Sequence, residues 1–248
     1  MLTPAIPIRQ RSHSMSIKNP PEMIVFDAVG TLIHPRPAVA DVYERIGRQH
    51  GSKLRAPEIG PRFRHAFHEQ DEMDRGGDWR TDEVREKARW RAIVESVLSD
   101  VPEKEACFRE LFDHFAQPEA WECGSDAASV LESLAREGYR LTIASNYDRR
   151  LRAVVAGLSD LKRAREIFVS SEIGWRKPSN RFFQALVAQT QLRPDQILHI
   201  GDNYVNDVAG ASSAGLQAWL LSPDGPPSSD HVSSLAAIPG RLALRAES

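Results

Sequence analysis

Short apolar runs alternate with amphipathic stretches along much of this chain, and most of the runs stop at a polar or turn-forming residue. Such runs are typical of buried strands, and they cover residues 23–26, 141–144, 197–200 and 217–221, with a weaker run at 167–169. Between them, apolar side chains recur at helical spacing over residues 127–136 and 182–188. Strands that alternate with helices predict an α/β fold, with a Rossmann-like parallel sheet covered by helices on both faces.

The stretch from residue 35 to residue 120 has a different pattern, because it shows several amphipathic helices and no clear strand. The candidate helices are residues 39–50, 59–73, 81–98 and 103–115. A helical block inserted after the first strand predicts an α-helical cap domain at residues 35–120, placed over the strand ends. The core domain is then residues 23–34 and 121–248, with the segment after Pro223 loop-like and peripheral.

Polar residues stand at the ends of predicted strands that lie far apart in the sequence. Asp27 follows the run at residues 23–26, Ser145 follows the run at 141–144, and Asp202 comes just after the run at 197–200. In an open parallel sheet, ligands bind at the carboxyl ends of the strands. We therefore expect these side chains to converge on one site.

Composition and charge narrow the classes of function. The chain of 248 residues has a formal net charge of −2 and lacks the basic character of a nucleic-acid-binding protein, so no nucleic-acid partner is expected. No apolar run approaches the roughly 18 residues that a membrane span needs, so no membrane partner is expected either. Cys107 and Cys123 show neither metal-ligand nor disulfide-framework spacing, which favours a reducing, cytoplasmic location. The oligomeric state stays open.

The first 22 residues differ from the remainder of the chain. They are rich in proline and serine and lack the continuous apolar core of a secretory signal. We expect residues 1–22 to form a flexible N-terminal tail.

The segment Phe26-Asp27-Ala28-Val29-Gly30-Thr31-Leu32 resembles the nucleophile motif of the haloacid-dehalogenase-like superfamily. Further elements follow in that family's order: Ser145-Asn146, then Lys177-Pro178, then Gly201-Asp202 with Asp207. The helical insert occupies the position of the family's first type of cap. In addition, the phrases YERIGRQHG and ARWRAIVESVL resemble the subgroup called domain-containing protein 3.

This resemblance implies a hydrolase that uses magnesium (Mg2+) and acts on a small, phosphorylated substrate. Asp27 would be the nucleophile that forms an aspartyl-phosphate, and the Asp27 carboxylate, the backbone carbonyl of Val29, and Asp202 would be metal ligands. Asp207 would be a further ligand or a partner of one. The remaining implied roles concern the phosphate oxygens, which would be hydrogen-bonded or neutralised by Ser145, Asn146, Lys177 and Thr31.

One position departs from the phosphatases of this superfamily, most of which carry a second aspartate two residues after the nucleophile. Here that position is Val29, which can neither protonate a leaving group nor activate water. Three alternatives to a Mg2+-dependent phosphohydrolase therefore stay open. They are a metal-free 2-haloacid dehalogenase using Asp27, a phosphonoacetaldehyde hydrolase with a cap lysine (Lys53, Lys87 or Lys104), and a catalytically weak binding protein. We favour the phosphohydrolase, because Asp202 would repel a carboxylate substrate in the absence of a metal.

Other charged and aromatic positions are interpreted as structural. The run from Asp71 to Arg91 is typical of a solvated helix face, and His65, His68 and Glu69 are assigned to an exposed face of the cap. Packing roles are expected for Trp79, Trp90, Trp121 and Trp175.

Overall fold

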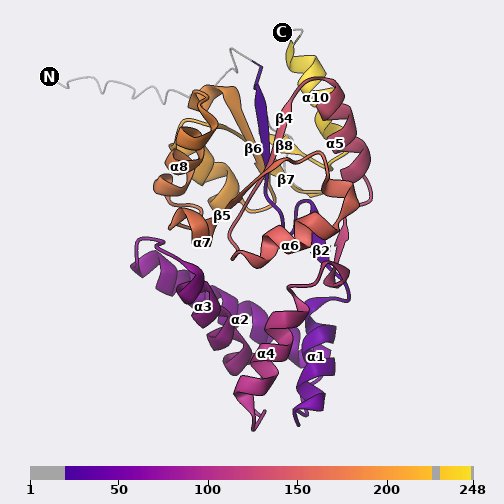
Figure 1. Cartoon of the computed structure of the whole chain (residues 1–248), viewed down its shortest axis with the longest axis vertical. Helices are drawn as coiled ribbons and strands as arrows, with labels where there is room; N and C mark the ends of the chain where they lie inside the picture. The colour runs from indigo at the N-terminus through magenta and orange to yellow at the C-terminus, as the bar shows by residue number, and fades with distance from the viewer. Residues whose placement is uncertain (1–19, 225–229, 247–248) are drawn as a thin grey trace, which may run out of the picture.

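The computed structural model describes residues 20–224 and 230–246, and its main feature is a parallel six-stranded sheet (Figure 1). The strand order is β5-β4-β1-β6-β7-β8. The strands are β1 (Met23–Phe26), β4 (Arg140–Ser145), β5 (Glu166–Val169), β6 (Ile197–Gly201), β7 (Gln217–Leu221) and β8 (His231–Val232). The predicted α/β fold with a Rossmann-like parallel sheet is thus confirmed.

Both faces of the sheet are buried, and β1 shows how its sequence allows this. Successive side chains of a strand point to opposite faces. Ile24 and Phe26 pack in one apolar cluster, together with Leu131 of α5 (Ala127–Arg136) and residues of α10 (Ala237–Ala246). The alternate residues, Met23 and Val25, pack on the other face in a cluster that contains side chains of α8 (Asn180–Thr190). A strand without polar residues is therefore required at this central position.

Shorter elements complete the layers around the sheet. They are the α-helices α6 (Arg150–Gly157), α7 (Ser170–Ile173) and α9 (Gly210–Ser213), the 3-10 helices η1 (Pro118–Ala120), η2 (Ser159–Leu161) and η3 (Pro194–Gln196), and the π-helix η4 (Tyr204–Ala209). A separate two-stranded antiparallel sheet joins β2 (Ile33–Pro35) to β3 (Trp121–Cys123). Pro35 ends β2 and pairs with Trp121, which begins β3. The two ends of the chain segment between these strands therefore lie side by side.

Between these two strands lie α1 (Val39–Gln49), α2 (Ala56–Gly76), α3 (Glu83–Val97) and α4 (Lys104–His114), here called the four-helix unit. The unit has an apolar cluster of its own, which includes Val42, Ile46, Ile93 and Phe108. It lies beyond the end of the sheet at which β2 and α6 are also found (Figure 1). Each of the four helices overlaps one of the helices predicted from the sequence.

The prediction for the C-terminal segment was wrong. The segment after Pro223 is not peripheral, because β8 extends the sheet and Ile238 and Leu242 of α10 are buried in the main core. Residues 225–229, and residues 1–19 of the tail predicted at residues 1–22, lie outside the described residues. Pro21 is already buried, and the Glu22 amide donates to the Gln196 carbonyl oxygen at 2.8 Å. None of the helices in the described ranges is long and apolar enough to cross a membrane.

Candidate functional site

The register of the parallel sheet brings three strand ends to one level. Phe26 of β1 pairs with Ile143 of β4 on one side and with Ile200 of β6 on the other. The residue after Phe26 is Asp27, so its carboxylate emerges between the end of β4, at Ser145, and the end of β6, just before Asp202. The predicted convergence of these segments is therefore a consequence of strand pairing.

Lys177 is the buried cation of this region. Its Nζ atom donates to Asp27 Oδ1 at 2.6 Å, to Asp207 Oδ1 at 2.6 Å and to the Ala144 carbonyl oxygen at 2.9 Å. Burial lowers the pKa of Lys177, but the charges of Asp207 and Asp27 outweigh it and raise that pKa above its usual value. The side chain therefore stays an ammonium with all of its protons engaged.

The backbone of Lys177 is fixed by Asn146. The Asn146 side-chain amide donates to the Lys177 carbonyl oxygen at 2.8 Å, and the Lys177 amide donates back to Asn146 Oδ1 at 2.7 Å. This pair of bonds ties the segment before α8 to the end of β4. The side chain of Asn146 is thus engaged with protein backbone, although the residue also lines the cavity described below.

Three carboxylates lie together beside this lysine. One oxygen each of Asp27, Asp202 and Asp207 lies within 4.8 Å of the others. Asp207 is the most enclosed, because its Oδ1 is bound by Lys177 and by His199 Nε2 at 2.9 Å, and its Oδ2 accepts from the Asn203 amide at 3.0 Å. Asp202 is the most exposed of the three.

The shared environment shifts the acidity of these groups in opposite directions. Burial raises the pKa of Asp27 to about 7; Asp207 and Asp202 add to the rise, and Lys177 opposes it. Loss of water and the charge of Asp207 also raise the pKa of Asp202. Burial acts in the same sense on Asp207, but Lys177 and His199 outweigh it and hold the pKa of Asp207 well below its usual range. The rise in the pKa of Asp27 shows that burial and the two neighbouring carboxylates together outweigh the charge of Lys177.

The turn after Asp27 is shaped by Gly30. Its φ of +96° is in the left-handed region, and a Cβ atom added there would lie 2.5 Å from Asp202 Oδ2. A side chain at this position would displace the Asp202 carboxylate. The next residue, Thr31, donates from Oγ1 to Asp202 Oδ1 at 3.1 Å. Thr31 is buried and is not among the residues that line the cavity, so its hydroxyl contacts a predicted metal ligand rather than open space.

A cavity of about 440 Å3 opens between the strand ends and the four-helix unit. Its floor contains the predicted site residues Asp27, Val29, Ser145, Asn146, Lys177, Asp202 and Asp207. Its walls are mostly apolar and aromatic and come largely from the four-helix unit. The structure thus places the predicted residues, except Thr31, around one cavity.

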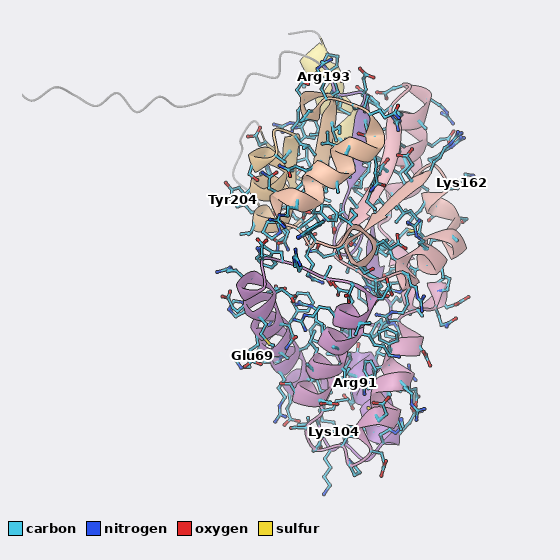
Figure 2. The ribbon with its side chains drawn as sticks, turned by 60° about the vertical axis from the view of Figure 1, so that its left-hand side comes forward. Glu69, Arg91, Lys104, Lys162, Arg193 and Tyr204 are labelled. Atoms are coloured by element: carbon cyan, nitrogen blue, oxygen red, sulfur yellow. The ribbon has the colours of Figure 1, made fainter. Side chains whose placement is uncertain are left out.

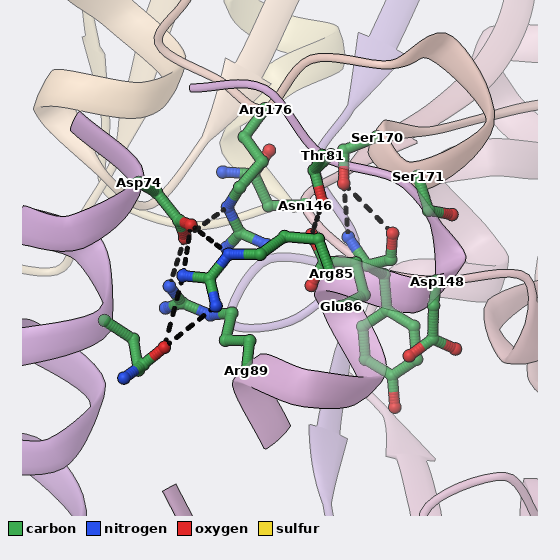
Figure 3. A network of polar contacts seen from close by, with 12 residues as sticks. Asp74, Thr81, Arg85, Glu86, Arg89, Asn146, Asp148, Ser170, Ser171 and Arg176 are labelled. Carbon is green, nitrogen blue, oxygen red and sulfur yellow. Dashed lines mark hydrogen bonds and ion pairs between the residues drawn. The ribbon is translucent and has the colours of Figure 1, made fainter. Parts of the chain in front are cut away.

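A network of buried ion pairs borders the cavity and joins the four-helix unit to the sheet (Figure 3). Arg176, which directly precedes Lys177, pairs through Nη1 with Glu86 of α3 and lies 3.5 Å from Asp74 of α2. Asp74 in turn binds Arg89 and Arg85 of α3. Backbone bonds run alongside: the Thr81 amide donates to Gly174 at 3.1 Å, and the Arg176 amide donates to Trp79 at 2.8 Å.

This network corrects one interpretation of the sequence. The charged run from Asp71 to Arg91 is not simply a solvated face, because Asp74, Glu86 and Arg89 are each at most 2% exposed. Their charges are balanced within the network, which includes one arginine from outside the run. Other residues of the run are solvated as predicted, such as Glu72 and Arg75, which form an exposed ion pair.

His199 is a further residue of the site that the sequence interpretation missed. It lies within β6 and is fully buried. Burial lowers the pKa of His199, so the ring is neutral, and its Nε2 carries the proton because its partner, Asp207, only accepts. The signal in the sequence was a titratable residue inside an otherwise apolar strand.

Most other candidates from the sequence lie away from the cavity, but His68 of α2, which is exposed as expected, also lines it. His65 and Glu69 form an exposed pair on α2, and Figure 2 shows Glu69 on the outside of the four-helix unit. Within the described ranges, Lys53, Lys87 and Lys104 are absent from the cavity lining, and Lys104 lies at the end of the unit far from the sheet (Figure 2). Trp121 and Trp175 have the packing roles that were expected, each against an apolar cluster of the core.

A family model described as haloacid dehalogenase-like hydrolase matches residues 21–215 of the chain. The chain belongs to this family of hydrolases. It is 28% identical over 241 residues to haloacid dehalogenase-like hydrolase domain-containing protein 3 of Danio rerio, which covers 90% of this chain and 97% of that protein. The resemblance to that subgroup is thus confirmed. A shorter match, 28% over 102 residues and 39% of this chain, is to glyceraldehyde 3-phosphate phosphatase of Methanothermobacter thermautotrophicus, of which it covers 43%.

Solved structures share the fold at lower identity. The Bacillus subtilis hydrolase YfnB, solved bound to magnesium, superposes with a TM-score of 0.71 at 16% identity, covering 91% of this chain and 100% of that one. L-2-haloacid dehalogenase from Xanthobacter autotrophicus gives a TM-score of 0.71 at 17% identity, covering 90% and 98%. The same fold therefore occurs in proteins with different named activities, and the site has to discriminate between them.

Proposed function

We propose that this hydrolase is a Mg2+-dependent phosphohydrolase that works through an aspartyl-phosphate on Asp27. The observation that carries the proposal is the group of three carboxylates beside one buried lysine, at the floor of a cavity. In this proposal the four-helix unit acts as a cap over the site.

The carboxylates suit a magnesium ion by chemistry and by charge. Mg2+ prefers oxygen ligands and is commonly held by one or two carboxylates. When Asp27, Asp202 and Asp207 are ionised, the ammonium of Lys177 leaves a net charge of −2 among these groups. A divalent cation balances that charge. Asp27 and Asp202 would hold it with the Val29 carbonyl, whereas Asp207, already bound by Lys177, His199 and Asn203, would support them from outside.

A bound Mg2+ would neutralise the repulsion between a carboxylate and an anionic phosphate. The side chains would perform the remaining steps. Asp27 lines the cavity, and Lys177 binds its Oδ1 and holds the carboxylate in place. Attack by Asp27 on phosphorus forms the new P–O bond, and the ester P–O bond breaks with its electron pair passing to the leaving group. Water then hydrolyses the aspartyl-phosphate to free phosphate and Asp27. Ser145, which lines the same cavity, would donate to the transferring oxygens.

Val29 limits which leaving groups can depart. General acid–base assistance contributes roughly 10²–10⁴-fold in rate, and a valine side chain supplies none. Leaving groups that depart as stable anions are least affected. The site is therefore suited to esters of acidic hydroxyl groups rather than of simple alcohols.

The proposal is supported over a 2-haloacid dehalogenase by the excess negative charge. Asp202 and Asp207 both line the cavity beside Asp27. Dehalogenation by Asp27 would need neither of these two carboxylates. A 2-haloacid carries a carboxylate, which these groups would repel in the absence of a metal. The shorter relative named as a phosphatase agrees with phosphate as the transferred group.

The test uses acetyl phosphate and p-nitrophenyl phosphate, with Mg2+ or with a chelator. We expect turnover that needs Mg2+ and is abolished in Asp27→Asn and Asp202→Asn. Asp160→Asn, at an exposed aspartate of η2, is the matched control and should keep full activity. Turnover in chelator, or unchanged turnover in Asp27→Asn, would end the proposal.

Two further measurements separate the alternatives. Halide release from a 2-haloacid in chelator would establish dehalogenation instead of phosphohydrolysis. A stable adduct of beryllofluoride with Asp27, seen by fluorine NMR in the presence of Mg2+, would exclude a protein that only binds. Absence of both the adduct and turnover would favour the binding protein.

A further inference from the structure

The wall of the cavity is a continuous row of aromatic rings that runs from the four-helix unit to the strand ends. Neighbouring ring centroids along the row lie between 5.5 and 6.4 Å apart. The rings, in order, are Phe67, Phe63, Tyr43, Phe115, Trp121 and Tyr147. All of them line the cavity, and Tyr147 is the neighbour of Asn146 at the floor. A planar ring entering this space would meet aromatic faces and edges along its whole length.

The hydroxyl group of Tyr43 is a polar group of this wall that is available to a ligand. Tyr43 is 1% exposed, and its hydroxyl forms no hydrogen bond with any part of the chain that the structure describes. By contrast, the Tyr147 hydroxyl and the Trp121 indole both donate to the Phe115 carbonyl oxygen at 3.2 Å. Because Tyr43 lines the cavity, its hydroxyl is suited to a hydrogen bond with a polar group on a bound ligand.

Two of the arginines that line the cavity, Arg89 and Arg150, leave little charge for a ligand. Arg89 is paired with Asp71 and Asp74, and its guanidinium lies over the Phe67 ring at 4.6 Å. Arg150 is paired with Asp148 and lies 3.4 Å over the ring of Phe112. Both side chains are mostly buried, at 1% and 11% exposed. Because the charges of Arg89 and Arg150 are balanced internally, the aromatic wall favours an uncharged body. Of the other lining arginines, Arg64 is exposed.

The size of the cavity sets a lower limit on that body. An apolar cavity of roughly 150 Å3 accommodates a benzene ring. The cavity here has about 440 Å3. A phosphate with a body of more than one ring therefore fits, whereas a small alkyl ester would leave most of the aromatic wall uncovered.

These observations agree with the constraint set by Val29 at the floor. A phenolic hydroxyl has a pKa near 10, as in tyrosine, so a phenolate departs with far less need for a proton than an alkoxide. In the reaction the P–O bond to the phenol oxygen breaks, the electron pair stays on that oxygen, and phosphorus is transferred to Asp27. We propose that the natural substrates are phosphate monoesters of phenols whose uncharged, multi-ring body occupies the aromatic wall and meets Tyr43 with a polar substituent. This inference rests on the proposed function.

Binding of non-hydrolysable phosphonates to the wild-type protein tests it without relying on turnover. Calorimetry in Mg2+ would compare naphthylmethylphosphonate, cyclohexylmethylphosphonate and methylphosphonate. We expect the naphthyl compound to bind at least about tenfold more tightly than the cyclohexyl compound, and the methyl compound to bind most weakly. Equal affinities of the three would overturn the inference.

The role of Tyr43 is tested with a hydroxyl-substituted naphthyl compound. We expect the added hydroxyl to tighten binding, and Tyr43→Phe to remove that gain, a loss of roughly 2–10-fold. Tyr139→Phe is the matched control, because this tyrosine lies outside the cavity lining. A gain that persists in Tyr43→Phe would refute the part assigned to Tyr43.

The same titrations distinguish the two proposals. If all three phosphonates bind equally, but only with Mg2+ and with Asp202 intact, the aromatic inference fails and the proposed function stands. If the naphthyl compound binds preferentially and neither chelator nor Asp202→Asn weakens it, the aromatic cavity stands and the proposed function fails.

Discussion

Replacing Arg176 with methionine tests whether the buried network holds the four-helix unit to the sheet. The side chains of Arg176 and Glu86 are only 4% and 1% exposed. Methionine keeps much of the unbranched apolar stem and removes the charge. In Arg176→Met, Asp74 keeps Arg85 and Arg89, but Glu86 keeps only the Thr81 hydroxyl, which donates to it at 2.7 Å. The variant therefore leaves one carboxylate buried without a cation.

The expected cost follows from that orphaned charge. Removing one partner of a buried ion pair typically costs about 3–5 kcal/mol of the free energy of unfolding. For a chain of this length, each kcal/mol lowers Tm by about 2–4 °C, so we expect a decrease of roughly 6–20 °C. Adding Glu86→Gln removes the uncompensated charge and should restore part of the loss.

Denaturant unfolding of the wild type, Arg176→Met, Glu86→Gln and the double variant gives the coupling energy of the pair. The matched control is the Arg36–Glu122 pair, at 2.6 Å, whose side chains are 73% and 46% exposed. Exposed pairs contribute about 1 kcal/mol or less. A coupling energy for Arg176–Glu86 no larger than that of Arg36–Glu122 would refute the reasoning from burial.

Three further predictions concern the core and the site. Gly30→Ala should abolish Mg2+ binding measured by calorimetry, because its Cβ would meet Asp202. The control is Gly138→Ala, at a residue with a similar φ of +93° and open space around it. This control should lose only about 1–2 kcal/mol of unfolding free energy and keep Mg2+ binding. Val29→Asp should accelerate hydrolysis of an alkyl phosphate at least roughly tenfold and change that of acetyl phosphate little; equal effects on both would show that proton transfer is not what the site lacks. Leu131→Ala, at a fully buried side chain, should cost about 2–5 kcal/mol of unfolding free energy, against less than about 0.5 kcal/mol for Val84→Ala, which is 78% exposed.

The central strands could be predicted from the sequence because each is buried on both faces. Continuous apolar runs such as Met23–Phe26, separated by helical segments, indicate buried strands of a parallel sheet. The C-terminal elements could not be predicted in this way. Strand β8 has only 2 residues, His231 and Val232, and its pairing with β7 depends on tertiary contacts that no local pattern encodes.

The convergence of the site was predictable for a related reason. Residues at the carboxyl ends of neighbouring parallel strands lie close together. The proximity of Asp27, Ser145 and Asp202 therefore follows from the predicted sheet alone. The buried ion-pair network could not be predicted from the sheet alone, because Glu86 lies in the four-helix unit and Arg176 lies in the segment before α8. A signal for part of it does exist: Glu86 and Arg89 continue, at helical spacing, the buried face of α3 that includes Ile93 and Val97. Charged residues on the apolar side of a helix indicate paired burial rather than solvation.

The adjacent pair Arg176 and Lys177 links the two halves of the molecule. Lys177 neutralises carboxylates at the strand ends, and Arg176 neutralises carboxylates of the four-helix unit. Asn146 holds the backbone of the same segment on both its donor and its acceptor. A shift of the four-helix unit that carries Glu86 away from Arg176 would leave charges unpaired in a buried region, next to the lysine that binds Asp27. We therefore expect the aromatic wall to keep a fixed position over Asp27, so that selection among substrates depends on the shape of the cavity rather than on closure around each ligand.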